Sequence, residues 1–157
     1  MQLELIATAA FGLEAVVARQ VKALGYTEVQ VENGKVTFWG DESAICRANL
    51  WLRSADRVLL KLGEFPATDF DQLFEATKAL PWATWLPADA AFPVTGKSQQ
   101  SQLSSVPACQ SIVKKAIVES LKGFYRLEHF PETGPTYTIE VALYKDIATL
   151  TIDTSGV

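Results

Sequence analysis

A stretch of ten residues, VQVENGKVTF at residues 29–38, restricts the fold more than any other part of this chain. Its central Asn-Gly dipeptide favours a two-residue hairpin turn. With that turn, Val31 lies opposite Val36. The next pair outward, Val29 and Phe38, then falls on the same face of the ladder, because side chains in a strand alternate with a period of two. The sequence therefore predicts an antiparallel hairpin and, with it, a sheet.

Apolar spacing predicts the elements on either side of this hairpin. Residues 2–8 alternate and then run apolar, as a strand does, and residues 12–25 carry apolar side chains at helical spacing. Gly25 is placed to end that helix in a left-handed cap. A second helix starts after Asp41, an N-cap residue, and residues 55–65 read as a strand. The order strand, helix, strand, strand, helix, strand is the split arrangement of ferredoxin-like folds.

A second set of elements is expected after Pro66. The stretch TDFDQLFEATKALPW has apolar residues three and four positions apart, which predicts a helix capped by Thr68 or Asp69. The turn that follows carries Trp82 and Trp85, which we expect to anchor it against the core.

The remaining elements are a strand, a long helix and a final hairpin. Residues 91–97 predict a strand, which Pro93 confines to a sheet edge or to the strand's first residues. A long amphipathic helix follows, and residues 136–153 fold back around a Lys145-Asp146 turn. Lys-Asp is a poor dipeptide for such a turn, and a longer loop is the alternative. That turn would create three apolar cross-strand pairs, namely Ile139 with Ile152, Val141 with Leu150 and Leu143 with Ala148.

The chain as a whole reads as two small globular domains. The expected fold class is α+β, with a ferredoxin-like N-terminal domain at residues 1–65 and an α/β domain at residues 66–157. Apolar residues make up 48% and charged residues 20%, which is an ordinary globular balance. No run approaches the roughly 18 apolar residues of a membrane span, and the N-terminus lacks the basic and apolar regions of a secretory signal. We therefore expect a cytoplasmic protein with no membrane partner.

Enzyme motifs are missing from this sequence. It has no glycine-rich loop for a phosphate or a nucleotide, no serine nucleophile motif and no HExxH motif. His129 is the only histidine, so a metal site would depend on scattered carboxylates. Cys46 and Cys109 lie in separate helical patterns, which favours reduced, partly buried thiols. The tryptophans are expected to pack rather than to stack on bases. We assign no catalytic, cofactor-binding or metal-binding residues.

Charge is distributed unevenly along the chain. The net charge is −4, but residues 92–126 hold 5 basic residues and 1 acidic residue, whereas residues 127–157 hold 1 and 5. The basic segment contains the unusual run KSQQSQLSS, which is rich in neutral hydrogen-bonding side chains and precedes the long helix. Helix N-termini leave backbone N–H groups unpaired and attract anions, so this run could seat a phosphate. The alternative interpretation is that the serines cap the helix and that the glutamines and lysines are simply solvated.

Five segments together resemble one known family. They are FGLEAVVARQVKALGY, VENGKVTFWGD, RANLWLRSADRVLLKLGEF, FDQLFEATKALPW and KSQQSQLSSVPACQSIVKKAI, and the chain ends in TIDTSG and a valine. The sequence closely resembles the N-terminal portion of bacterial RNA methyltransferases that contain a THUMP domain, in the group of ribosomal RNA guanine-N2 methylases. The similarity covers nearly the whole chain in order and spacing.

The resemblance implies a ferredoxin-like domain at residues 1–65, a THUMP domain at residues 66–157 and a catalytic methyltransferase domain that is absent from this chain. It implies that the parent protein uses S-adenosylmethionine and that the THUMP domain captures structured RNA, with ribosomal RNA as the first candidate and transfer RNA as the second. The catalytic domain would be a partner in cis. The residues that we expect to hold RNA backbone are Lys97, Ser98, Gln99, Ser101, Ser104 and Ser105, with Lys114 and Lys115 steering and Gln110 as a weaker candidate.

Two other classes of function stay open at this point. A protein-interaction or domain-positioning module without direct RNA contact would agree with the net acidity. A small enzyme on a ferredoxin-like scaffold would need a cleft with a perturbed acid or base, and the arginine cluster of Arg47, Arg53 and Arg57 is explained by helix and strand surface.

Overall fold

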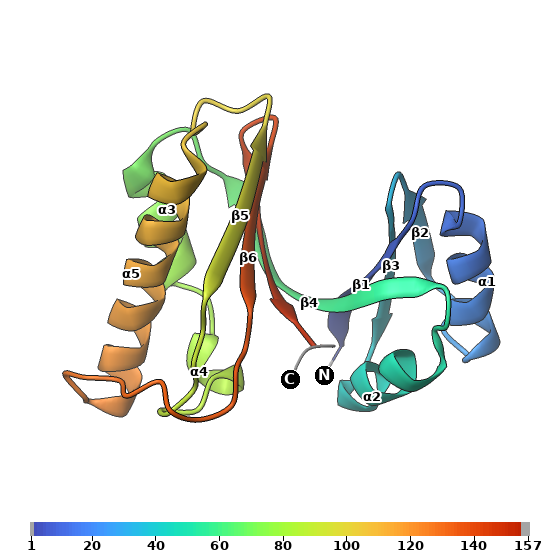
Figure 1. The fold of residues 1–157 in the computed structure, drawn as a ribbon, viewed down its shortest axis with the longest axis horizontal. Helices are drawn as coiled ribbons and strands as arrows, with labels where there is room; N and C mark the ends of the chain where they lie inside the picture. Colours follow the sequence, from blue (N-terminus) through green and yellow to red (C-terminus); the bar gives the residue numbers. More distant parts are fainter. Residues whose placement is uncertain (1, 155–157) are drawn as a thin grey trace. The chain divides into compact units, whose positions relative to one another are not determined.

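The computed structural model describes residues 2–154, which form two compact units. The first unit comprises residues 2–61 together with Asp153 and Thr154, and the second comprises Leu62–Ile152. Hydrogen bonding joins seven strands in the order β2-β3-β1-β4-β7-β6-β5 (Figure 1). The fold is mixed α+β, as the sequence predicted.

The first unit has the ferredoxin-like element order. Its elements are β1 (Leu3–Ala9), α1 (Glu14–Ala23), β2 (Val29–Glu32), β3 (Lys35–Gly40), α2 (Glu42–Trp51) and the first part of β4 (Ala55–Pro66). All strand pairs in the order β2-β3-β1-β4 are antiparallel. The predicted hairpin register is confirmed, because Val31 pairs with Val36 and Val29 pairs with Phe38.

Local sequence signals place the helix ends of this unit. Gly25 has a φ of +104°, and its N–H donates to the Lys22 carbonyl at 3.0 Å, so it ends α1 as predicted. The Asp41 side chain accepts from the Ser43 N–H at 3.0 Å and caps α2. Helix α1 then buries Val17 and Val21 against β1, β2 and β3.

Two packing expectations for α2 are wrong. Cys46 is exposed, and Trp51 has 56% of its surface exposed, although both were expected to be at least partly packed. Helix α2 buries Ala44 and Ala48, which lie one turn apart on the face toward the sheet. Cys46 is two positions from each of these alanines, which turns it to the opposite side of the helix. Cys109 is buried in the second unit.

The second unit contains the elements predicted after Pro66. They are α3 (Phe70–Lys78), α4 (Trp82–Trp85), β5 (Val94–Gln99), α5 (Val106–Tyr125), β6 (Ile139–Tyr144) and β7 (Ile147–Asp153). Strand β5 lies at the edge of the sheet and runs parallel to β6, and β6 runs antiparallel to β7. The strand predicted at residues 91–97 lies later along the chain than expected, so Ser98 and Gln99 belong to β5 rather than to the loop.

The helices of this unit lie on one side of β5 and β6 (Figure 1). Ile139, Val141 and Leu143 are buried on that side, while the residues between them alternate toward the other face. Trp82 is fully buried, and its indole N–H donates to the Thr77 carbonyl at 2.7 Å, so the predicted anchoring role is confirmed. The opposite face of β5 and β6 therefore carries no helix among the described residues of this unit.

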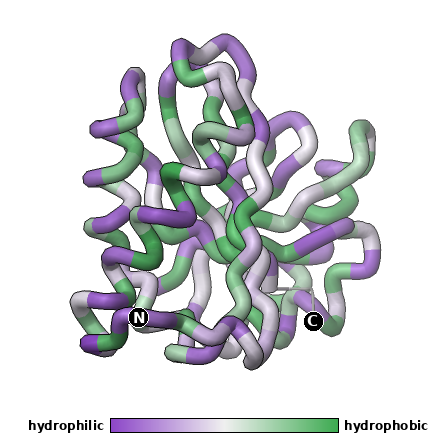
Figure 2. The backbone as a smooth tube through the Cα atoms, turned by 60° about the vertical axis from the view of Figure 1, so that its left-hand side comes forward, coloured by the Kyte–Doolittle hydropathy of each residue, from purple (hydrophilic) through white to green (hydrophobic). Residues whose placement is uncertain are grey.

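Each helix carries both hydrophobic and hydrophilic residues, so hydropathy varies from residue to residue within a helix. Figure 2 shows hydrophobic and hydrophilic positions following one another along the backbone. Within residues 2–154, no helix is both long enough and apolar enough to cross a membrane.

Candidate nucleic-acid interface

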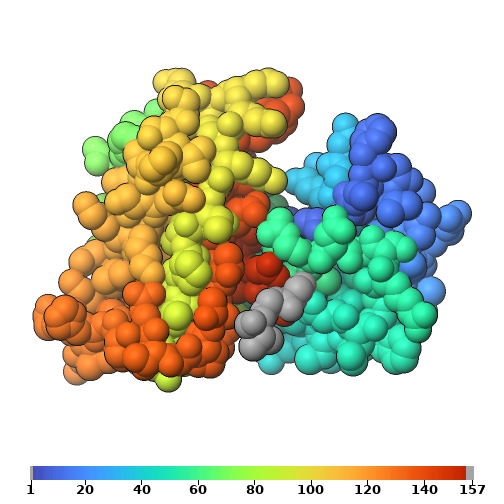
Figure 3. Space-filling model, in the orientation of Figure 1, coloured from blue at the N-terminus to red at the C-terminus, as the bar shows by residue number. Residues whose placement is uncertain are grey.

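Three segments meet at the carboxyl end of β5: the loop after this strand, the start of α5 and the β6–β7 turn (Figures 1 and 3). Hydrogen bonds fix this arrangement. The Lys145 N–H donates to the Gln99 carbonyl at 3.2 Å, and the Asp146 N–H donates to Ser101 Oγ at 3.0 Å. Asp146 Oδ1 in turn accepts from the Gln102 N–H at 2.7 Å. We call residues 98–106 and 144–147 together the β5 end.

The start of α5 is open toward solvent. Ser105 is the N-cap residue, but no side chain of the described residues makes a capping hydrogen bond there. Pro107 stands in the first turn, which contains no acidic residue. The first main-chain bond of the helix runs from the Cys109 N–H to the Ser105 carbonyl, so the N–H groups before Cys109 have no partner within the helix. A helix of 20 residues thus directs its positive end at this surface.

The predicted hydroxyl groups divide into two kinds. Ser98 Oγ donates to the Leu103 carbonyl at 2.7 Å, and Ser101 Oγ donates to the Gln99 carbonyl at 2.9 Å. These two side chains hold the loop in shape, as short polar side chains commonly do. Ser104 and Ser105 are exposed beside the helix start. They are the predicted hydroxyls with the freest access to a ligand.

Gln110 lies on the inner side of α5. A Cβ atom at Gly96 would be 3.3 Å from Gln110 Cγ and 3.2 Å from Val106 Cγ1, so the missing side chain lets the helix approach β5 closely. Gln110 is accordingly half-buried. It stays a weaker candidate for RNA contact.

Lys97 and Gln99 lie on the other face of the sheet. Gly96 and Ser98 contact α5 and its preceding loop, and because strand side chains alternate, Lys97 and Gln99 point away from α5. The Lys97 ammonium is 3.7 Å from Glu140 Oε1, yet 68% of the lysine side chain is exposed. The structure therefore divides the predicted site between two faces that share the β5 end.

Lys114 is engaged in contacts within the second unit. Its ammonium donates to Glu132 Oε1 at 2.7 Å and to the Phe92 carbonyl at 2.9 Å, and it lies 3.6 Å from the centre of the Phe92 ring. The hydrogen bond from Lys114 holds the pKa of Glu132 below its usual value. Lys114 is about 12 Å along α5 from Val106, at a rise of about 1.5 Å per residue. Lys115, the next residue, is exposed.

Sequence reasoning missed Tyr144 and Lys145 as candidate contacts. Tyr144 ends β6, with half of its surface exposed, and the Lys145 ammonium lies 5.2 Å from the centre of its ring. One indication was available, because Tyr144 is out of phase with the apolar residues of β6 that face the core. The parallel pairing of Gln99 with Tyr144 brings both residues to the β5 end, and no local pattern predicts that pairing.

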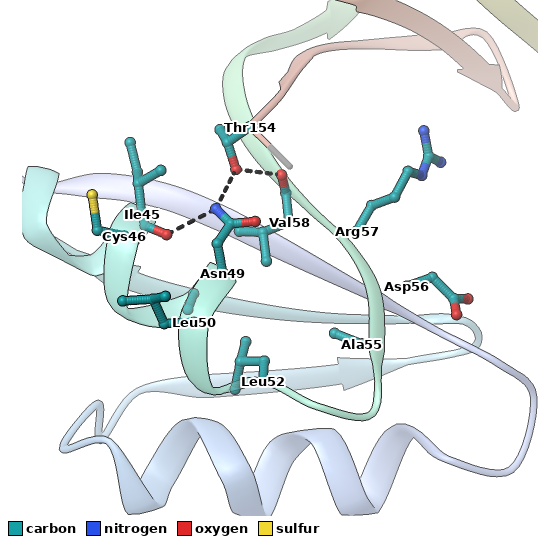
Figure 4. A pocket seen from close by; sticks show the side chains of 11 residues that line it. Ile45, Cys46, Asn49, Leu50, Leu52, Ala55, Asp56, Arg57, Val58 and Thr154 are labelled. Carbon is teal, nitrogen blue, oxygen red and sulfur yellow. Dashed lines mark hydrogen bonds between the residues drawn. The ribbon is translucent and has the colours of Figure 1, made fainter. Parts of the chain in front are cut away.

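A separate hollow lies on the first unit, between α2 and the start of β4 (Figure 4). It has a volume of about 540 Å³. Asn49 Nδ2 donates to Thr154 Oγ1 at 3.1 Å, and that hydroxyl donates to the Val58 carbonyl at 2.6 Å, so these lining polar groups are already paired. Leu50 is 71% exposed beside the hollow, and Trp51 follows it at the end of α2.

Family comparisons agree with both units. The sequence model of the THUMP domain family matches residues 67–153. The chain belongs to the THUMP domain family. Ahead of the THUMP domain, residues 4–59 match the RlmL ferredoxin-like domain, which agrees with the resemblance drawn from the sequence.

Two relatives are similar over almost the whole chain. YpsC from Bacillus subtilis, assigned as an RNA methyltransferase, is 55% identical over 97% of this chain and 40% of its own length. The ribosomal RNA large subunit methyltransferase K/L of Syntrophotalea carbinolica is 31% identical over 98% of the chain and 22% of its own length. This chain therefore spans less than half of the length of either relative.

Solved structures show the same two-domain fold. A protein from Listeria monocytogenes, assigned as an N6-adenine-specific DNA methylase, is 58% identical with a TM-score of 0.94, over 98% of this chain and 40% of that chain. SMU.472, assigned as a methyltransferase and crystallised with SAH, is 46% identical with a TM-score of 0.93, over 97% of this chain and 41% of that chain.

Proposed function

We propose that this chain is the RNA-capturing module of an S-adenosylmethionine-dependent RNA methyltransferase, and that the β5 end holds the ribose-phosphate backbone. The observation that carries the proposal is the start of α5. It presents N–H groups without helical partners, no acidic residue in its first turn and the exposed hydroxyls of Ser104 and Ser105. Such a surface suits phosphate oxygens and makes no choice between bases.

Charge around the β5 end supports this assignment. Lys97 and Lys145 are exposed there. The nearby carboxylate of Asp146 accepts from the N–H of Gln102, a loop residue that precedes the helix. With only a few phosphate contacts, we expect non-specific affinities of roughly 10⁻⁴ to 10⁻⁶ M at physiological salt.

Ribosomal RNA is the first substrate that we propose, with transfer RNA as the second and guanine N2 as the modified atom. Support comes from the resemblance of the sequence and from the name of the K/L relative. The cofactor does not fit the residues present here, since the chain lacks a glycine-rich turn from strand to helix. We therefore place S-adenosylmethionine in a methyltransferase domain outside this chain, in keeping with the SAH bound to SMU.472.

Substituting Ser105→Asp tests the site directly. Aspartate is also a good N-cap, so the helix should stay folded while its free N–H groups are occupied by a carboxylate. One added negative charge about 4 Å from a phosphate costs ~1 kcal/mol in water, which corresponds to about fivefold weaker RNA binding. The measurement is fluorescence anisotropy with a ribosomal RNA fragment, a transfer RNA and a DNA of equal length, each at two salt concentrations.

Ser120→Asp is the matched control, because it adds the same charge toward the other end of α5. It should leave RNA affinity close to that of the parent. Equal affinity of the parent and Ser105→Asp would overturn the assignment of the site. A parent chain without salt-dependent RNA binding would overturn the proposed function.

A positioning module is the second candidate. The exposed side chains of Leu50 and Trp51 and the adjoining hollow favour it, since contiguous exposed apolar groups mark surfaces for protein contact. In that case, the chain would dock a catalytic domain without touching RNA. The same titration separates the two candidates, because only the RNA-capturing module loses affinity as salt increases.

A further inference from the structure

The face of the sheet without helices carries a row of side chains at the β5 end. Gln99 of β5 pairs with Tyr144 of β6, and Tyr144 pairs with Ile147 of β7. Paired residues point to the same side of a sheet. The Tyr144 ring therefore lies between the side chains of Gln99 and Ile147. Lys97 lies on the same face, two residues before Gln99 in β5.

Tyr144 does not contribute to the core. Half of its surface is exposed, whereas Ile139, Val141 and Leu143 of the same strand are buried on the opposite face. Ile147, beside it, is also partly exposed. An exposed ring with an aliphatic neighbour forms a flat apolar platform of the kind on which unpaired bases stack.

Two exposed lysines lie near this platform. The Lys145 ammonium lies 5.2 Å from the ring centre, and Lys145 is exposed. Lys97 stands on the same face with 68% of its side chain exposed. Three carboxylates lie near these lysines. Glu140 has 16% of its side chain exposed, Asp146 accepts a hydrogen bond from the Gln102 N–H, and the exposed Glu64 accepts one from Thr149 Oγ1 at 3.2 Å.

The platform and the start of α5 are parts of one end of the second unit. The Gln99 carbonyl and Ser101 Oγ accept from the N–H groups of Lys145 and Asp146, which ties the β6–β7 turn to the loop before α5. A polynucleotide strand held at the helix start could therefore pass to the platform without crossing the helical layer.

We propose that Tyr144 stacks on an unpaired base of the bound RNA while Lys145 and Lys97 contact its phosphates. This inference rests on the proposed function and adds a class of substrate to it, namely RNA with a single-stranded segment. A base within a duplex is stacked on its own neighbours and cannot reach the ring. The chain should therefore prefer single-stranded RNA over a duplex of the same composition.

The experiment uses the 157-residue chain and a single-stranded RNA that carries a fluorescent adenine analogue. Tyr144→Ala is expected to weaken binding about tenfold, in the range that alanine substitution gives for one stacked base. It should also abolish the quenching of the analogue that stacking produces. Tyr144→Phe keeps the ring and should restore both readouts. Binding of the same sequence as a duplex should not change.

Phe11→Ala is the matched control, because Phe11 is an exposed aromatic residue of the first unit. Circular dichroism melting confirms that each variant is folded before it is compared. If Tyr144→Ala binds and quenches like the parent while RNA binding stays salt-dependent, the stacking role is overturned and the proposed function stands. If the parent shows no salt-dependent binding, both fail together.

Discussion

Lys114 was predicted to attract RNA by its charge, but in the structure it forms contacts within the second unit. The sequence places it on the polar face of a basic helix, which predicted a steering charge for RNA. In the structure, its ammonium joins α5 to Glu132 and to the Phe92 carbonyl, with the Phe92 ring beneath it. Its contribution to RNA binding stays a prediction, but its charge already has partners.

The Lys114–Glu132 pair should make stability depend on pH. The pKa of Glu132 is lowered in the folded state, mainly by the hydrogen bond from Lys114. A lowered folded pKa adds stability above the unfolded value, which is about 4.3 for glutamate, and this stability is lost as pH falls through the folded pKa. Lys114→Met should therefore be less stable than the parent at neutral pH, and the difference should shrink in acid.

Urea unfolding of both proteins from neutral pH to about pH 3 measures this difference, and NMR titration of Glu132 shows whether its pKa returns toward the usual value. Lys115→Met is the control, because the exposed Lys115 should leave the pH profile unchanged. A difference between Lys114→Met and the parent that stays constant across this range would show that the pair contributes no proton-linked stability.

At the scale of elements, helix α3 is defined by its first turn. Asp69 Oδ1 accepts from the Gln72 N–H at 2.8 Å, and Gln72 Oε1 accepts from the Thr68 N–H at 2.8 Å. The first bond satisfies an N–H that the helix itself leaves unpaired, and the second ties the residue before the cap to the first turn. The sequence had offered Thr68 and Asp69 as alternative caps, and the structure selects Asp69.

Removing this cap should cost a defined amount of stability. Asp69→Ala is expected to lower the free energy of unfolding by about 1 kcal/mol, which is typical for loss of an N-cap side chain. Asp69→Asn keeps an oxygen acceptor and should cost only a few tenths of that. Chemical denaturation with far-UV circular dichroism compares the two variants with the parent. Equal losses for both would mean that the charge, not the hydrogen bond, stabilises α3.

At the scale of the whole molecule, each unit has a core of its own. The second unit buries one contiguous cluster that includes Leu73, Trp82, Ile117 and Leu150. The first unit buries Leu5, Val17 and Phe38, among others, within its own sheet and helices. Strand β4 runs through both units, because it extends from Ala55 to Pro66 and the units divide after residue 61.

Separate cores predict separate local stabilities. Ile117→Ala removes fully buried side-chain volume from α5 and should destabilise the second unit by about 2–5 kcal/mol. Hydrogen exchange should then accelerate for the amides of β6 and β7, while those of β1 and β3 keep the protection of the parent. Val17→Ala should give the reciprocal pattern. Equal acceleration in both units would show that the chain unfolds as one cooperative body.

The sequence alone determined the features that depend on neighbours along the chain. The Val31–Val36 and Val141–Leu150 pairings follow from two-residue turns, and Gly25 and Asp41 end and begin helices through bonds that reach only a few residues. The final turn formed even though Lys145 and Asp146 both need positive φ angles, because the apolar pairs on either side fix the register. Such local rules also gave the order of elements and hence both domains.

Only the tertiary structure decided which candidate residues share a surface. Strands β5 and β6 are separated by the whole of α5, so their parallel pairing depends on contacts distant in sequence. That pairing placed Tyr144 beside Gln99, and the packing of α5 against Gly96 left Lys97 on the other face. Since strand side chains alternate with a period of two, a shift of one residue would move all of them to the other face. The sequence could name the polar groups, but the register of one non-local pair chose their partners.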